Sequence, residues 1–237
     1  MELEKQLRNL VTQQLRNFKK MTFSEENYLK SIYHLTISLD GEISTNAIAE
    51  MMETKASSVT DMLKKLAEKD LVNYKKYQGV SLTVNGKLAA KMIVRKHRLW
   101  EVFLVEKLDF SWDEVHDIAE QLEHIKSEKL INKLDDFLGN PTEDPHGDPI
   151  PDAHGRIITI EKQLVSELHA NQSGICVGVK DNSSDFLKYL DKQQIGLGTK
   201  IDVIAKEIFD LSIKIKVNNQ EMTISNKIAS NLFVKLV

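Results

Sequence analysis

The chain of 237 residues contains little cysteine, proline or glycine. Its single cysteine, Cys176, excludes an intramolecular disulfide framework and a cysteine-rich zinc site. Ten glycines and four prolines are about half the usual share, which excludes a collagenous or low-complexity chain and favours helices. No apolar run approaches the roughly 18 residues of a membrane span, and the first residues lack the apolar core of a secretory signal. We therefore expect a cytoplasmic protein with no membrane partner.

The net charge of −3 conceals a strong asymmetry along the chain. Residues 55–98 carry eleven basic and three acidic side chains, whereas residues 99–155 carry four basic and fifteen acidic ones. A basic block attracts phosphates through Coulomb forces and counterion release, and an acidic block can concentrate metal cations. Solvated helix faces would give the same pattern, so charge alone leaves both interpretations open.

The hydrophobic periodicity predicts a mainly α-helical chain followed by a small β domain. Helices are expected over residues 2–19, 22–39, 84–107 and 111–137, with two short helices between, one capped by Ser44 or Thr45 and one opened by Ser57. A hairpin is expected over residues 71–83, around a Gln-Gly turn. All four prolines lie within residues 139–156, which marks a domain boundary. Beyond it, short strands are expected over residues 175–179, 200–205, 212–217, 222–225 and 233–237, which could close a small barrel.

A helix-turn-helix followed by a hairpin is a winged-helix arrangement, in which the second helix enters the major groove of DNA. Hydroxyl and carboxylate side chains on the exposed start of that helix can bond base edges, and lysines on the helix and hairpin can bond phosphates. The predicted DNA-binding residues are Lys55, Ser57, Ser58, Asp61, Lys64, Lys65, Lys75 and Lys76. A winged helix that binds another protein is the alternative.

Two segments place potential metal ligands at helical spacing. His97 and Glu101 lie four residues apart, and His116, Glu120, Glu123 and His124 follow at spacings that share one helix face. A divalent cation would neutralise the neighbouring carboxylates, although a solvated acidic face with incidental histidines is the alternative. Because the ligand atoms are oxygen and imidazole nitrogen, Mn²⁺ or Fe²⁺ fits, and Zn²⁺, Co²⁺ or Ni²⁺ could substitute in vitro.

Several motifs occur in one order along the chain. They are Asn27-Tyr28-Leu29, Ala56-Ser57-Ser58-Val59-Thr60, Arg95-Lys96-His97-Arg98-Leu99-x-Glu101, Val115-His116-Asp117, Glu123-His124 and His146-Gly147-Asp148-Pro149-Ile150-Pro151. Together they resemble the metal-dependent repressors of the diphtheria toxin repressor (DtxR) and manganese transport regulator (MntR) family over residues 22–155. Residues 160–237 resemble, more loosely, the SH3-like FeoA-type domain of the longer members.

The resemblance implies a homodimer that binds palindromic double-stranded operators when loaded with metal. It implies a primary metal site of Asn27, Glu120, Glu123 and His124, and an ancillary site of His97, Glu101 and His116, to which Asp185 could add a ligand. The implied domains are an N-terminal helical extension over residues 1–21, a winged helix over 22–94, a metal-binding and dimerisation domain with its linker over 95–155, and an SH3-like barrel over 156–237.

The resemblance leaves the metal open. Iron-sensing members have cysteine where this chain has Glu120, which favours Mn²⁺, but Asn27 matches neither the aspartate of manganese sensors nor the methionine of iron sensors. Glu26 or a water molecule could complete the ligand shell instead. We interpret His146 and His154 as turn residues.

Two other functions remain as alternatives. One is a winged-helix regulator that responds to an organic effector and binds DNA equally well after chelation. The other is a di-metal carboxylate enzyme, which would need Glu-x-x-His motifs that the candidate ligands do not form. We therefore expect a regulator with no catalytic residues and no organic substrate.

Overall fold

The computed structural model describes residues 21–38, 42–76 and 78–237, so the helix predicted over residues 2–19 lies outside it. The chain forms two compact units. The N-terminal unit comprises the described residues up to 96 together with 123–128 and 151–156. The C-terminal unit comprises residues 97–122, 129–150 and 157–237. Among the described residues, no helix has both the length and the hydropathy that a membrane crossing needs.

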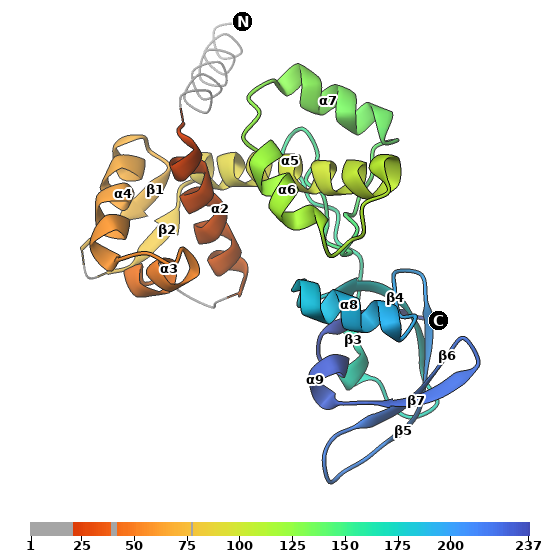
Figure 1. Ribbon diagram of the computed structural model, residues 1–237. Helices are drawn as coiled ribbons and strands as arrows, with labels where there is room; N and C mark the ends of the chain where they lie inside the picture. The colour runs from red at the N-terminus through yellow and green to blue at the C-terminus, as the bar shows by residue number, and fades with distance from the viewer. Residues whose placement is uncertain (1–20, 39–41, 77) are drawn as a thin grey trace, which may run out of the picture. The chain divides into compact units, whose positions relative to one another are not determined.

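The N-terminal unit is a winged helix (Figure 1). Its elements are α2 (Phe23–Ser38), α3 (Thr45–Met51), α4 (Ala56–Glu68), β1 (Val72–Tyr74), β2 (Val80–Leu82) and the beginning of α5 (Val84–Leu108). β1 and β2 pair antiparallel, and Gly79 has the positive φ of 80° that the turn before β2 requires. The predicted helix-turn-helix and hairpin are confirmed.

Side-chain caps explain where α2, α3 and α5 begin. Thr22 and Glu25 form a reciprocal capping box at α2, the Ser44 hydroxyl accepts from the Ala47 amide, and the Thr83 hydroxyl accepts from the Gly86 amide. The helices α2, α3 and α4 and the hairpin bury a common apolar core. It includes Leu29, Ile32, Ile48, Val59, Leu63, Leu66 and Val80.

The C-terminal unit begins with helices. It holds the rest of α5, then α6 (Val115–Leu122), and most of α7 (Glu128–Phe137). The prediction of one helix over residues 111–137 is wrong, because the chain turns between α6 and α7. Glu123 and His124 lie in that turn and not on the face of α6. Neither glycine nor proline marks this break, so the local sequence gave no signal for it.

The sheet domain, residues 163–236, completes the C-terminal unit. Its elements are β3 (Gln163–Leu164), a 3₁₀ turn (Val165–Glu167), β4 (Ser173–Val179), α8 (Ser184–Lys192), β5 (Lys200–Lys206), β6 (Ile213–Val217), β7 (Gln220–Ile224), α9 (Asn226–Ala229) and β8 (Leu232–Leu236). The strand order is β3-β8-β4-β5-β6-β7, and neighbouring strands are antiparallel. The predicted strands are present, whereas α8 and α9 were missed. The sheet stays open, with β3 and β7 at its edges, so the expected closed barrel is wrong in this detail.

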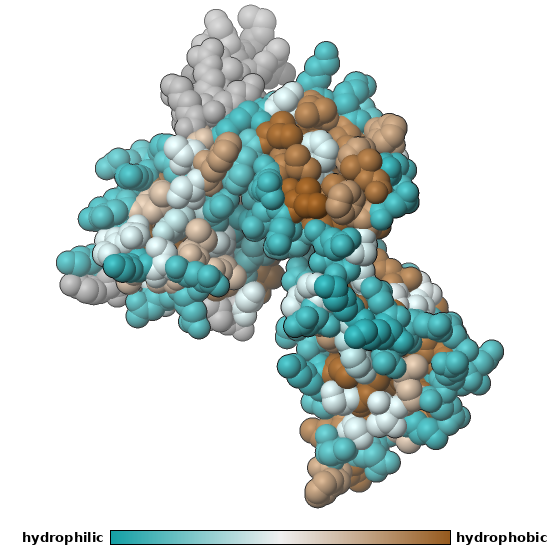
Figure 2. Space-filling model, in the orientation of Figure 1, coloured by the Kyte–Doolittle hydropathy of each residue, from teal (hydrophilic) through white to brown (hydrophobic). Residues whose placement is uncertain are grey.

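Two groups of exposed apolar side chains in the C-terminal unit bear on contacts with other chains. Leu108 at the end of α5 and Leu130 and Phe137 on α7 are 51%, 43% and 64% exposed. Figure 2 shows hydrophobic side chains gathered over these helices. Ile208 and Phe209, in the connection from β5 to β6, are 94% and 100% exposed. Surfaces of this kind mark candidate contacts with other protein chains.

Candidate metal centres and DNA-binding surface

A first cluster of buried polar side chains lies within the N-terminal unit. Glu26 Oε2 lies 2.6 Å from His124 Nδ1, and Glu26 Oε1 accepts from Lys126 Nζ at 2.8 Å. Glu123 Oε2 accepts from Lys30 Nζ at 2.8 Å. Glu26 and Glu123 are only 2% and 0% exposed. Because buried carboxylates are costly unless they are paired, the ammonium groups of the two lysines act as their counter-cations.

The side chain of Asn27 contributes a buried oxygen, Oδ1, that lacks a hydrogen-bond partner among the described residues. An amide oxygen is a hard ligand, and with the carboxylates and the imidazole of the first cluster it forms the mixed oxygen and nitrogen donor set that suits Mn²⁺ or Fe²⁺. Burial also lowers the pKa of the nearby Lys96 ammonium, although Glu26 and Glu123 oppose that change. The chemistry of these donors therefore suits a divalent cation, although Glu26, Glu123 and His124 are not among the groups of described residues whose ligand atoms all lie within 4.8 Å of one another.

Glu120, the remaining residue of the expected primary site, belongs to the C-terminal unit. Its side chain is about half exposed, and its Oε1 lies 3.8 Å from His116 Nε2. Sequence reasoning considered Glu26 only as a substitute and did not select Lys30 or Lys126. Glu26 and Lys30 lie four residues apart on α2, and this helical spacing was the available signal that they share one face, although Lys30 pairs with Glu123.

A second cluster consists of His97, Glu101 and His116. His97 Nε2 lies 3.0 Å from Glu101 Oε1 and 3.2 Å from His116 Nδ1. One ligand atom from each residue lies within 4.8 Å of the others. Burial raises the pKa of Glu101, but hydrogen bonds from His116 and His97 outweigh it and hold that pKa far below the usual value. The expected ancillary residues thus lie together, with an anionic carboxylate between two imidazoles.

The second cluster extends to two residues of the proline-rich segment. Glu101, Asp144 and His146 also bring ligand atoms within 4.8 Å of one another, and all three are buried. Asp144 Oδ1 accepts from the His146 and Asp148 amides, so His146 does lie in a tight turn. Burial, followed by the nearby carboxylate of Glu101, raises the pKa of Asp144. Sequence reasoning missed Asp144 and gave His146 no part in metal binding, because only the fold brings them to Glu101.

Asp185, the residue expected to add a ligand, is exposed in the first turn of α8. It joins none of the potential metal-binding groups found among the described residues. His154 is exposed, and its amide donates to Asp152 Oδ1 within a turn.

The predicted DNA-binding residues form an exposed surface on the winged helix. All eight are exposed in the structure, namely Lys55, Ser57, Ser58, Asp61, Lys64, Lys65, Lys75 and Lys76. α4 buries Val59, Leu63 and Leu66, which leaves its opposite face to solvent. In the free chain, Lys64 Nζ donates to Asp61 Oδ1 at 3.1 Å, so a base or phosphate would compete with this exposed ion pair.

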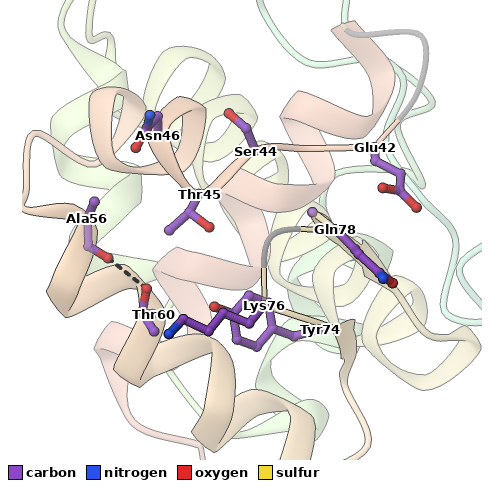
Figure 3. A pocket seen from close by; sticks show the side chains of 10 residues that line it. Glu42, Ser44, Thr45, Asn46, Ala56, Thr60, Tyr74, Lys76 and Gln78 are labelled. Carbon is purple, nitrogen blue, oxygen red and sulfur yellow. Dashed lines mark hydrogen bonds between the residues drawn. The ribbon is translucent and has the colours of Figure 1, made fainter.

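A hollow of about 570 Å³ lies beside this surface (Figure 3). Ser44, Thr45 and Asn46 at the start of α3 line it, together with Thr60 of α4 and Lys76 at the wing. These hydroxyl and amide groups could bond phosphate and sugar oxygens. Sequence reasoning considered Ser44 and Thr45 only as helix caps and missed Asn46 and Thr60, because their convergence depends on the packing of α3 against α4.

Three family models match successive parts of the chain. They describe the N-terminal DNA-binding domain of iron-dependent repressors (residues 20–80), the metal-binding and dimerisation domain of the same repressors (83–152) and the FeoA domain (164–236). The chain is 36% identical over 118 residues to an HTH-type transcriptional regulator of Methanocaldococcus jannaschii, covering 50% of this chain and 94% of that one.

The chain belongs to the DtxR/MntR family of metal-dependent transcriptional repressors. It is a long member, with a FeoA domain after the dimerisation domain. The repressor is also 36% identical over 117 residues to the regulator MntR of Oceanobacillus iheyensis, covering 49% of this chain and 78% of that one. A solved manganese-dependent transcriptional repressor in complex with manganese is 33% identical, with a TM-score of 0.80 over 90% of this chain and 100% of the other. The family comprises repressors rather than enzymes, which removes the di-metal enzyme alternative.

Proposed function

We propose that this repressor is a Mn²⁺ sensor whose primary site is built on the first cluster. The observation that carries the proposal is the contact of buried Glu26 with His124, together with the buried carboxylate of Glu123 and the buried, unpartnered Oδ1 of Asn27. All its donors are oxygen or imidazole nitrogen. Relatives described as manganese-dependent add support, while Fe²⁺ remains the second candidate. Glu120 is a further proposed ligand, and His97, Glu101 and His116 form the proposed ancillary site.

The mechanism follows from where these residues lie. Glu26 and Asn27 are on α2, which also contributes to the core of the winged helix, whereas Glu123 and His124 lie in the turn after α6. When bound, a divalent cation supplies the positive charge that neutralises the buried carboxylates. Glu26, Asn27, Glu123 and His124 then hold α2 and the turn in one arrangement, which Lys30 and Lys126 hold less specifically without metal.

DNA recognition would use two copies of α4. We propose a homodimer on a palindromic operator, with the two recognition helices in major grooves about 34 Å apart. Metal favours the arrangement that matches this spacing, so metal and DNA strengthen each other's binding reciprocally. Binding chromosomal DNA in this way implies a cytoplasmic location.

The deciding experiment is retention of genomic DNA fragments by chelated protein, with and without added Mn²⁺, and with Fe²⁺ under anaerobic conditions. We expect retention only with Mn²⁺, and we expect Glu123→Ala to abolish it. Glu128→Ala, which removes a nearby exposed carboxylate, is the matched control and should behave as wild type. Equal retention with Fe²⁺ would favour an iron or dual sensor. Retention after chelation would instead favour the regulator with an organic effector, and unchanged metal dependence in Glu123→Ala would reject the primary site.

A further inference from the structure

The connection between α5 and α6 is attached to the sheet domain through two side chains. Trp112 packs against the core of the sheet domain, and its Nε1 donates to Asp191 Oδ1 of α8 at 3.0 Å. Asp113 Oδ2 accepts from Ser184 Oγ at 3.1 Å and lies 3.4 Å from Lys188 Nζ, also on α8. The position of this short connection therefore depends on the position of α8.

The backbone of the same tryptophan holds a histidine of the extended second cluster. The Trp112 carbonyl oxygen lies 2.8 Å from His146 Nε2, and the two rings are nearly parallel, with centroids 6.1 Å apart. A carbonyl oxygen only accepts hydrogen bonds, so Nε2 must carry the proton. In the neutral ring, Nδ1 then keeps its lone pair, and this atom lies 3.8 Å from Glu101 Oε2. A protein group that fixes the tautomer in this way orients a histidine for metal binding.

A second element of the sheet domain holds the other side of the His146 turn. The Val179 amide at the end of β4 donates to the His146 carbonyl at 2.9 Å. Gly147 has a φ of 80°, and a Cβ at this position would lie 2.0 Å from the Val177 carbonyl oxygen. The turn therefore lies directly against β4, and only glycine fits at its closest point.

We propose that Trp112 is a positioning residue that fixes the tautomer and orientation of His146, and that its hydrogen bond to Asp191 makes this arrangement depend on the sheet domain. The metal affinity of the extended second cluster is thereby coupled to the docking of α8, although Asp191 is no ligand. This inference rests on the proposed metal binding by the second cluster.

The test compares two variants of the full chain at Asp191, which is exposed and therefore tolerant of substitution. Asp191→Leu removes the acceptor for the indole N–H, whereas Asp191→Asn keeps a carbonyl oxygen there. In Asp191→Leu we expect the Mn²⁺ affinity of the second cluster, measured by calorimetric titration, to fall about 10- to 100-fold. The affinity of the first cluster should stay unchanged, and Asp191→Asn should restore most of the loss.

A second readout needs no metal. Long-range ¹H–¹⁵N spectra of the metal-free chain report the tautomer of each histidine, with His146→Gln identifying the signals of His146. In wild type and in Asp191→Asn, we expect His146 to occupy one tautomer, with the proton on Nε2. In Asp191→Leu we expect a mixture of the two tautomers. Trp112→Phe keeps a stacked aromatic ring but lacks the indole N–H donor, and we expect the same mixture there. Glu161→Leu, which removes another exposed carboxylate of the C-terminal unit, should match wild type in both measurements.

The possible failures can be told apart. If Asp191→Leu kept the wild-type tautomer of His146 and the wild-type Mn²⁺ affinity, the coupling would be overturned. Equal losses of Mn²⁺ affinity in Asp191→Leu and Asp191→Asn would also overturn it, because the hydrogen bond between Trp112 and residue 191 would then not be the cause. A wild-type chain that binds no Mn²⁺ at the second cluster would overturn the proposed ancillary site and the coupling of its affinity. The positioning of His146 by Trp112 would still be decided by the spectra.

Discussion

Three carboxylates define the chemistry of this repressor at the scale of single residues. Glu26, Glu101 and Glu123 are each 2% exposed or less, and each lies within hydrogen-bond distance of a lysine or a histidine. A buried charge without such a partner would destabilise the fold by several kcal/mol. The lysines and histidines therefore offset the cost of burying these carboxylates, and a bound cation would compete with them for the same carboxylate oxygens.

Asn27 gives a direct test of the first cluster. Asn27→Asp places a full negative charge where the unpartnered amide oxygen lies. Because a buried site screens the attraction between this charge and a bound cation only weakly, the affinity for Mn²⁺ should rise by about tenfold or more. Calorimetric titration with Mn²⁺ measures the change. Asn171→Asp adds the same charge at an exposed turn and should leave the affinity unchanged. Equal affinities in Asn27→Asp and wild type would remove Asn27 from the ligand set.

At the scale of elements, α2 connects metal binding to the DNA-binding fold. Its first turn carries Glu25, which caps the helix, followed by Glu26 and Asn27 of the first cluster. Lys69, at the end of the recognition helix α4, donates to Glu25 Oε1 at 2.6 Å. One turn of helix therefore presents potential metal ligands and also fixes the distal end of α4.

The Glu25 contacts predict how stability depends on pH. Burial raises the pKa of Glu25, but the hydrogen bonds from Lys69 and Thr22 together outweigh it and lower that pKa. The stabilisation is therefore complete above the pKa of the unfolded chain and is lost as pH falls through the lower pKa of the folded chain. Glu25→Gln should lower the free energy of unfolding at pH 7 by roughly 1–2 kcal/mol. The difference from wild type should shrink as pH falls below about 4.

Denaturant unfolding of the full chain, followed by circular dichroism at pH 7 and pH 3.5, measures this difference. Glu50→Gln, at an exposed position of α3, is the control and should change stability little at either pH. A loss in Glu25→Gln that is equal at both values of pH would contradict a role for the charged carboxylate.

At the scale of the whole molecule, the region matched by the dimerisation model exposes apolar side chains. The metal-binding and dimerisation model matches residues 83–152, which contain the exposed side chains of Leu108, Leu130 and Phe137. Phe137 lies against Phe103, with ring centroids 6.5 Å apart, so its exposed face continues an aromatic group of α5. Covering this surface with a second copy would remove it from water.

Phe137→Asp tests the dimer surface. A second copy seated on this surface would bury the new charge at a cost of several kcal/mol in each protomer, so we expect the variant to sediment as a monomer at micromolar concentration. Retention of operator DNA should fall with it. Phe209→Asp changes an equally large apolar side chain, fully exposed between β5 and β6, and should remain dimeric. If the Phe209→Asp variant were monomeric and the Phe137→Asp variant stayed dimeric, the dimer interface would instead lie on the sheet domain.

The sequence by itself determined the elements of the winged helix, most strands of the sheet domain and the family. Caps at Thr22, Ser44 and Thr83 and the periodic burial of Val59, Leu63 and Leu66 act over a few residues, so they can be read locally. Helical spacing likewise selected His97, Glu101 and His116 as candidate ligands, the family resemblance grouped them into one site, and the fold brings them together.

Only the tertiary structure decided which distant groups meet. α6 ends at Leu122 without a helix-breaking residue, and Glu123 is buried against Lys30 of α2, far away in the chain. The pairing of Glu26 with His124 and the place of His146 beside Glu101 arise in the same way. Such contacts depend on how whole elements pack, because packing and the pairing of buried charges override local helical periodicity.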